Sequence, residues 1–72
     1  MPFKYPILTP MKIISALQKI GFRFVSQKGS HMKYTDGIRV VIIPNHDTIA
    51  RGTLKSILGQ AGVGIDDFIK LL

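Results

Sequence analysis

The short stretch SQKGSHMKYTDG holds the side chains best suited to chemistry. Within it, His31 lies between Lys28 and Lys33 and directly follows Ser30. An imidazole can accept or donate a proton near neutral pH, so His31 could act on RNA as a general base at the 2′-hydroxyl or as a general acid at the 5′-oxygen. Lys28 and Lys33 could hold the phosphate and stabilise the charge of the transition state, and Ser30 could position the backbone by a hydrogen bond. An ordinary exposed histidine beside a turn is the alternative.

Few other residues could do chemistry. The chain contains no cysteine, its four acidic residues are all aspartates, and it has two histidines. His46 is a weaker second candidate, because a solvated loop histidine would look the same in the sequence. His46 and Asp47 would need further metal ligands that the chain scarcely supplies, so we expect no metal site and no other cofactor. Asp66 and Asp67 are adjacent, and we expect them to interact favourably with the dipole of a helix N-terminus.

The net charge of +6 is unevenly distributed along the chain. The first 35 residues contain six of the ten lysine and arginine residues and no acidic residue. This asymmetry favours a polyanionic partner, most often a nucleic acid, or an acidic protein. A basic surface without a specific partner is the alternative.

No segment has the run of about 18 apolar residues that a membrane-spanning helix needs, so we expect a soluble, cytoplasmic protein with no membrane partner.

The first expected element is a helix over about residues 10–20, after an extended lead-in over residues 1–8. Thr9 is a suitable helix N-cap, and Pro10 suits the first helical position because its missing N–H costs nothing there. Gly21 suits the left-handed conformation that ends many helices. Four apolar residues at helical spacing form the expected core stripe, namely Ile13, Ile14, Leu17 and Ile20.

Two strands are expected next. Aromatic and β-branched residues over 22–28 favour the first strand, which Gly29 ends. Polar and apolar residues then alternate over 31–35, as they do in a strand with one buried face. This alternation places His31, Lys33 and Thr35 on one face, and Met32 and Tyr34 on the other.

A third strand is expected to return antiparallel to the second. Asp36 and Gly37 are typical of a two-residue hairpin turn. The stretch IRVVIIP follows, and Pro44 ends it because proline cannot donate a hydrogen bond to the sheet. Its expected core face consists of Ile38, Val40 and Ile42.

Two helices complete the expected fold. The spacing of Leu54, Ile57, Leu58 and Ala61 predicts a helix over about 52–61, which Gly62 stops. A short last helix is marked by Ile65, Phe68, Ile69 and Leu72. The order α-β-β-β-α, with a short C-terminal helix, predicts one α+β domain over residues 1–72, with the helices packed on one face of a three-stranded antiparallel sheet.

Three segments together resemble the HicA (YcfA-like) toxins of bacterial and archaeal toxin–antitoxin pairs. PILTPMKIISALQKIGF is similar to the family's opening helix, which ends in Gly-Phe, and QKGSHMKY resembles its Gly-Ser-His signature. RVVIIPNHDTIARGTLKSILGQAGVGIDDFIKLL is similar to the closing half, in which a proline and a histidine precede GTLKSIL. The resemblance covers about residues 6–72, and the three segments in this order and spacing are strongly specific.

The resemblance implies a compact fold like that of a double-stranded-RNA-binding domain. It also implies a ribosome-independent ribonuclease that cleaves mRNA, and a partner antitoxin, HicB, that covers its active site. The family's catalytic histidine falls on His31. Gly29 and Ser30 precede it in the signature, and with Lys28 and Lys33 they are the expected RNA contacts.

One residue of the signature segment departs from the family pattern. Met32 stands where many relatives carry a second histidine or another polar residue, so a possible helper of His31 is missing there. Two non-catalytic functions remain open on the sequence. One is a module that holds double-stranded RNA by its shape and phosphates, and the other is a domain whose basic face docks an acidic antitoxin.

Overall fold

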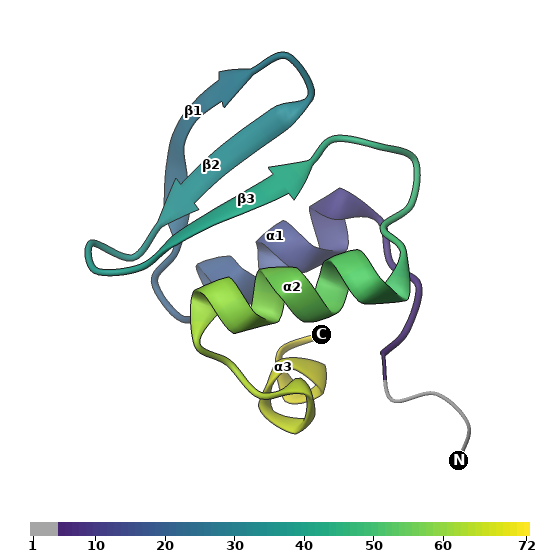
Figure 1. Cartoon of the computed structure of the whole chain (residues 1–72). Coiled ribbons are helices and arrows are strands. Elements are labelled where there is room, and N and C mark those ends of the chain that lie inside the picture. Colours follow the sequence, from purple (N-terminus) through teal and green to yellow (C-terminus); the bar gives the residue numbers. More distant parts are fainter. Residues whose placement is uncertain (1–4) are drawn as a thin grey trace.

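The computed structural model describes residues 5–72. The first four residues of the expected lead-in lie outside the described part, and Leu8, near its end, forms an isolated antiparallel bridge with Ile49. The elements follow the expected order, with a third helix at the C-terminus (Figure 1). They are α1 (Pro10–Gln18), β1 (Arg23–Lys28), β2 (His31–Thr35), β3 (Val40–Pro44), α2 (Arg51–Ala61) and α3 (Ile65–Leu71).

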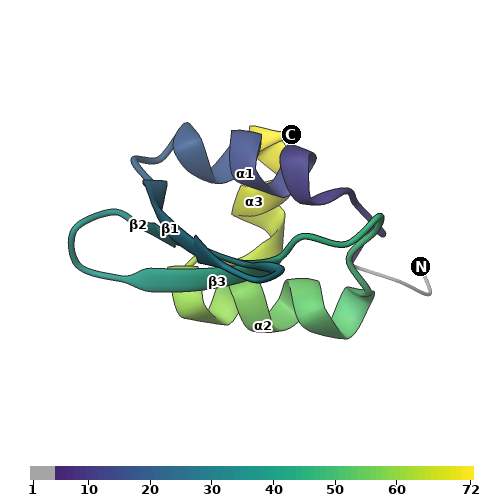
Figure 2. The ribbon, with the colours of Figure 1, turned by 90° about the horizontal axis from the view of Figure 1, so that it is seen from above.

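The three strands form one antiparallel sheet in the order β1-β2-β3. Figure 1 shows the sheet above α1 and α2, with α3 below them, and Figure 2 shows α2 running beside β3. At that edge the backbone N–H of Ile42 donates to Oε1 of Gln60 in α2, at 2.9 Å. Helix α2 therefore protects one edge of the sheet. The predicted α+β class and the α-β-β-β-α order are confirmed.

Helix α1 begins as predicted and ends earlier. The backbone N–H of Lys12 donates to Oγ1 of Thr9, the N-cap, at 3.4 Å. The helix stops at Gln18, and the chain turns through Gly21, which has a φ of 100°. Because of this turn, Phe22 takes the next core position, while Ile20 is 40% exposed. The prediction that Ile20 belongs to the core stripe was wrong.

Strand β1 contains a bulge that the sequence analysis did not foresee. Counting back from the Lys28–His31 pair, an unbroken register would place Val25 opposite Tyr34. The observed register instead pairs Phe24 with Tyr34, and Val25 is the extra residue. The rings of Phe24 and Tyr34 consequently meet edge to face, with centroids 5.6 Å apart.

The predicted core face of the third strand was wrong. Val41 and Ile43 are fully buried, whereas Val40 is 48% and Ile38 is 87% exposed. The register explains the difference, because Thr35 pairs with Val40 and paired residues share a face of the sheet. Ile42, the third residue of the expected core face, also lies on the side away from the helices and is half-buried.

The turn between β2 and β3 has four residues rather than the expected two. Oδ1 of Asp36 accepts hydrogen bonds from the backbone N–H groups of Ile38 and Arg39, at 2.9 and 2.7 Å. The Arg39 bond first, and then the Ile38 bond, lower the pKa of Asp36 below its ordinary value of 3.8. An aspartate that bonds backbone groups two and three residues ahead stabilises this wider loop. The loop in turn sets the register of β3.

The C-terminal half follows the prediction closely in α2 and less so in α3. The expected α2 residues are buried, and the helix ends at Gly62, whose φ is 70°. Asp66 and Asp67 lie in the first turn of α3 as expected. In α3, however, only Phe68 is buried, and the predicted stripe residues Ile69 and Leu72 are about half exposed.

One apolar cluster forms the core between the sheet and the helices. Its members come from α1, β2, β3, α2 and α3 and from the connections before β1 and α2, while every residue of β1 is exposed. They are Ile13, Ile14, Ala16, Leu17, Phe22, Met32, Tyr34, Val41, Ile43, Ile49, Leu54, Ile57, Leu58, Ala61 and Phe68. Within residues 5–72, no helix has the length and apolar character that crossing a membrane would require.

Candidate active site

The sheet has one face that no helix covers, which we call the outer face. The pairings of the three strands place nine residues on it, and none of them is buried. They are Arg23, Ser26 and Lys28 of β1, His31, Lys33 and Thr35 of β2, and Val40, Ile42 and Pro44 of β3. These nine residues include three permanent cations and no carboxylate, so the outer face presents a positive surface.

A tight turn delivers His31 to the outer face. Gly29 and Ser30 form a two-residue loop between the paired residues Lys28 and His31. Only the first loop residue has a positive φ, 59° at Gly29, which is the pattern of a type II′ turn. The side chain of Gln27 donates to the carbonyl of Gly29 at 2.9 Å and supports this turn.

The structure brings the predicted site residues together. Lys28 is directly opposite His31, a position at which Cβ atoms lie about 4.5–5.5 Å apart in antiparallel sheets. Lys33 lies two residues further along β2, on the same face. All three side chains are exposed, and Gly29 and Ser30 are exposed beside them. A proton-transfer group and two cations therefore share one open surface.

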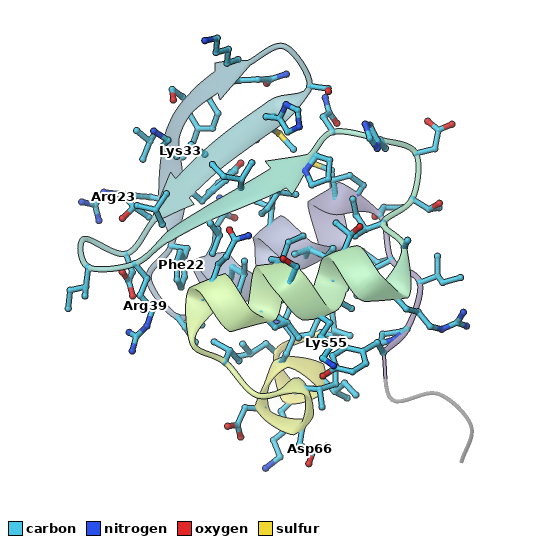
Figure 3. All side chains as sticks on the ribbon, in the orientation of Figure 1. Phe22, Arg23, Lys33, Arg39, Lys55 and Asp66 are labelled. Carbon is cyan, nitrogen blue, oxygen red and sulfur yellow. The ribbon has the colours of Figure 1, made fainter. Side chains whose placement is uncertain are left out.

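Arg23 is a third cation of this surface and was not predicted from the sequence. The bulge at Val25 shifts the register so that Arg23 pairs with Thr35 on the outer face. Without the bulge, Arg23 would point to the opposite side of the sheet. Figure 3 shows Arg23 and Lys33 on the strands, far from Lys55 on α2. No signal in the sequence marks the bulge, because Phe24 and Val25 both suit a strand.

A second polar segment lies beside the His31 turn. The backbone N–H of Asn45 donates to the carbonyl of Ser30 at 2.6 Å, which extends the β2–β3 pairing by one residue. His46 follows Asn45 directly, and both are exposed. The weaker candidate of the sequence analysis is thus at the same end of the sheet as His31. The backbone contact across the sheet could not be deduced from the sequence.

The described residues offer no cluster of metal-binding side chains. Among residues 5–72, no three histidine, cysteine, aspartate or glutamate side chains are grouped so that they could hold a metal ion. The outer face itself carries one imidazole, two lysines and one arginine, groups that can transfer a proton and stabilise negative charge.

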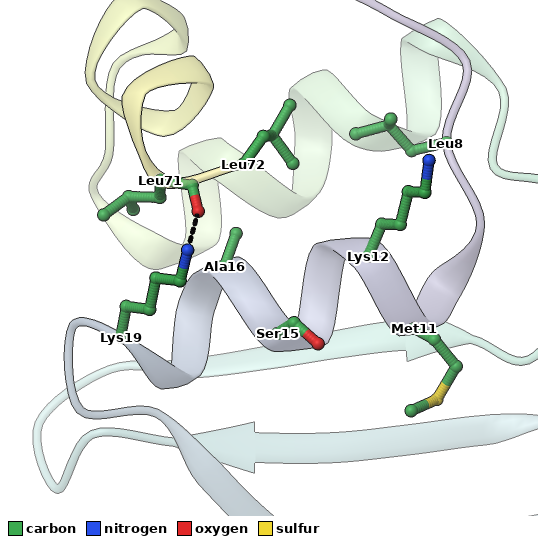
Figure 4. A pocket seen from close by; sticks show the side chains of 8 residues that line it. All are labelled: Leu8, Met11, Lys12, Ser15, Ala16, Lys19, Leu71 and Leu72. Atoms are coloured by element: carbon green, nitrogen blue, oxygen red, sulfur yellow. Dashed lines mark hydrogen bonds between the residues drawn. The ribbon is translucent and has the colours of Figure 1, made fainter.

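A pocket of about 350 Å³ lies away from the outer face, between α1 and the end of α3. Figure 4 shows the side chains that line it, which are mostly apolar and include the polar residues Lys12, Ser15 and Lys19. Nζ of Lys19 donates to the carbonyl of Leu71 at 2.6 Å and ties the two helices together. None of the predicted site residues lines this pocket.

A family model described as the HicA toxin of bacterial toxin–antitoxin systems matches residues 11–63. The match includes all of α1 except Pro10, the whole sheet and α2, and therefore the outer face with its Gly-Ser-His turn. No curated protein sequence matches the chain. Because the family model covers most of the 72 residues, the chain belongs to the HicA toxins of bacterial toxin–antitoxin systems.

Proposed function

We propose that this toxin is an endoribonuclease that cleaves mRNA in the cytoplasm without a ribosome, a metal ion or another cofactor. A HicB-type antitoxin binds it and covers the outer face. The observation that carries the proposal is the position of His31, which is exposed, directly opposite Lys28 and two residues from Lys33. Membership of a toxin family supports a harmful activity that a partner must restrain.

The proposed reaction uses the ribose of the RNA as its own nucleophile. A base removes the proton of the 2′-hydroxyl, the 2′-oxygen forms a bond to phosphorus, and the bond from phosphorus to the 5′-oxygen breaks. An acid delivers a proton to the departing 5′-oxygen. The products are a 2′,3′-cyclic phosphate and a 5′-hydroxyl. His31 transfers one of the two protons, and the cations of the outer face stabilise the negative charge on the phosphate oxygens.

The proposal is tested first with the purified chain and a defined mRNA, in the absence of ribosomes. We expect cleavage in the presence of EDTA, and loss of cleavage when the antitoxin is added in equal amount. Expression of the chain alone should arrest growth of a bacterial host, and co-expression of the antitoxin should relieve the arrest. RNA binding without cleavage would favour the non-catalytic double-stranded-RNA-binding module instead. Folded chain that neither binds RNA nor slows growth would leave only the antitoxin-docking function.

RNA affinity should depend strongly on salt, because each phosphate neutralised by a cation releases counterions. Lys28→Ala or Lys33→Ala should weaken binding to all RNA sequences similarly and lower the slope of log affinity against log salt by about one. The measurement is a fluorescence-anisotropy titration at several salt concentrations.

Lys55→Ala is the matched control for these two variants, because it removes the same charge from an exposed position of α2. Its slope of log RNA affinity against log salt should equal that of the wild type. Equal effects of the three variants would show that only net charge matters, and that the outer face does not contact the phosphates.

A further inference from the structure

The connection between β3 and α2 holds four exposed polar residues beside the His31 turn, namely Asn45, His46, Asp47 and Thr48. Short backbone hydrogen bonds hold both ends of this segment. The N–H of Asn45 donates to the carbonyl of Ser30 at 2.6 Å, and the N–H of Ile49 donates to the carbonyl of Leu8 at 2.7 Å. Ile49 is also buried in the core. The segment is therefore held in place.

The register brings His46 close to His31. Pro44 lies opposite His31, and Asn45 lies opposite Ser30. His46 therefore lies beside the Gly29–Ser30 turn. β3 ends at Pro44 and the chain bends at His46, so His46 directly follows the last residue that is bonded across the sheet. His31 at the end of the turn and His46 next to the backbone partner of Ser30 can therefore act on the same phosphate group.

We propose that His46 is the second proton-transfer residue of the site, and that it acts as the general acid while His31 acts as the general base. This inference rests on the ribonuclease function proposed above. His31 takes the proton of the 2′-hydroxyl as the bond from the 2′-oxygen to phosphorus forms. His46 gives its proton to the 5′-oxygen as the bond from phosphorus to that oxygen breaks. Exchange with water then returns both side chains to their starting forms.

The residues around the two histidines fit a site with two proton-transfer groups. Lys28 is opposite His31 and Lys33 is two residues away, so both cations can hold the phosphate on which the histidines act. Met32 supplies no second proton-transfer group on β2, since its thioether carries no proton and its side chain is buried.

The test compares two RNAs that differ in one atom at the scissile position. In one RNA the leaving group is the normal 5′-oxygen, and in the other a sulfur replaces it. A thiolate departs without being protonated, so the sulfur RNA needs no general acid. His46→Ala should slow cleavage of the normal RNA by about 10²–10⁴-fold, and should cut the sulfur RNA at nearly the wild-type rate. His31→Ala should be slow on both RNAs.

Thr48→Ala is the control within the same segment, and it should cut both RNAs like the wild type. A His46→Ala variant that cuts the normal RNA at the wild-type rate would overturn the role of His46. An equal loss on both RNAs would overturn its role as the acid. A wild-type chain that cuts neither RNA would instead overturn the ribonuclease function itself.

Discussion

Replacing His31 with alanine should abolish most RNA cleavage and leave the fold intact. Cleavage should fall by about 10²–10⁴-fold, which is the usual contribution of a positioned proton-transfer group. The fold should survive because His31 is exposed on the outer face and lies outside the core cluster. RNA binding should also survive, because Lys28, Lys33 and Arg23 remain. The measurement is the cleavage rate of one RNA, with circular dichroism and binding recorded on the same samples.

His31→Gln tests whether position 31 must transfer a proton, because glutamine keeps a polar side chain of similar reach and cannot transfer a proton near neutral pH. It should be as slow as His31→Ala. A folded His31→Ala variant that cuts RNA as fast as the wild type would exclude His31 as the catalytic residue.

Leu58→Ala should have the largest effect on stability. Leu58 is buried in the middle of α2, and its loss would leave a cavity in the core. Such truncations cost about 2–5 kcal/mol, a large share of the total of roughly 5–15 kcal/mol for a folded domain. The variant should therefore be largely unfolded or melt at a much lower temperature. The measurement is chemical denaturation followed by circular dichroism.

Ile38→Ala is the matched control, because it removes an aliphatic side chain of the same size from a position that is 87% exposed. Its free energy of unfolding should stay within about 0.5 kcal/mol of the wild type. Equal losses in the two variants would mean that the tip of the β2–β3 loop packs against the protein, contrary to the structure.

The helices and the second strand could be predicted because their signals are local. The cap at Thr9, the spacing of the α2 residues and the alternation over 31–35 each lie within one element. The alternation also placed His31 and Lys33 correctly on an exposed face. Ile20 and Ile69 could not be placed, because turns and helix contacts outside the stripe decide their burial.

The core face of the third strand was predicted from the residues of that strand alone, without its pairing to the second strand. A two-residue turn would have paired Thr35 with Ile38, on the face away from the core, so the expected core face conflicted with the alternation of β2. Applying the pairing rule would have assigned Val41 and Ile43 to the core. The four-residue loop shifts the pairing of Thr35 to Val40 and keeps the same alternation.

Two features of the site depend on contacts that no local pattern shows. The bulge at Val25 brings Arg23 to the outer face, and the Asn45–Ser30 hydrogen bond brings His46 beside the His31 turn. Both arise from pairing between strands. The sequence therefore predicts the central histidine and its two lysines, and only the folded sheet reveals the residues that surround them.

We propose that the outer face cuts RNA through the ribose 2′-hydroxyl without a metal ion. The most direct test uses the wild-type chain in EDTA and two RNAs that differ only by a 2′-deoxy nucleotide at the mapped scissile position. The all-ribose RNA should be cut to a 2′,3′-cyclic phosphate end, and the deoxy RNA should remain intact at that position. Cleavage of the deoxy RNA at the same position, or loss of all cleavage in EDTA, would contradict the proposed mechanism.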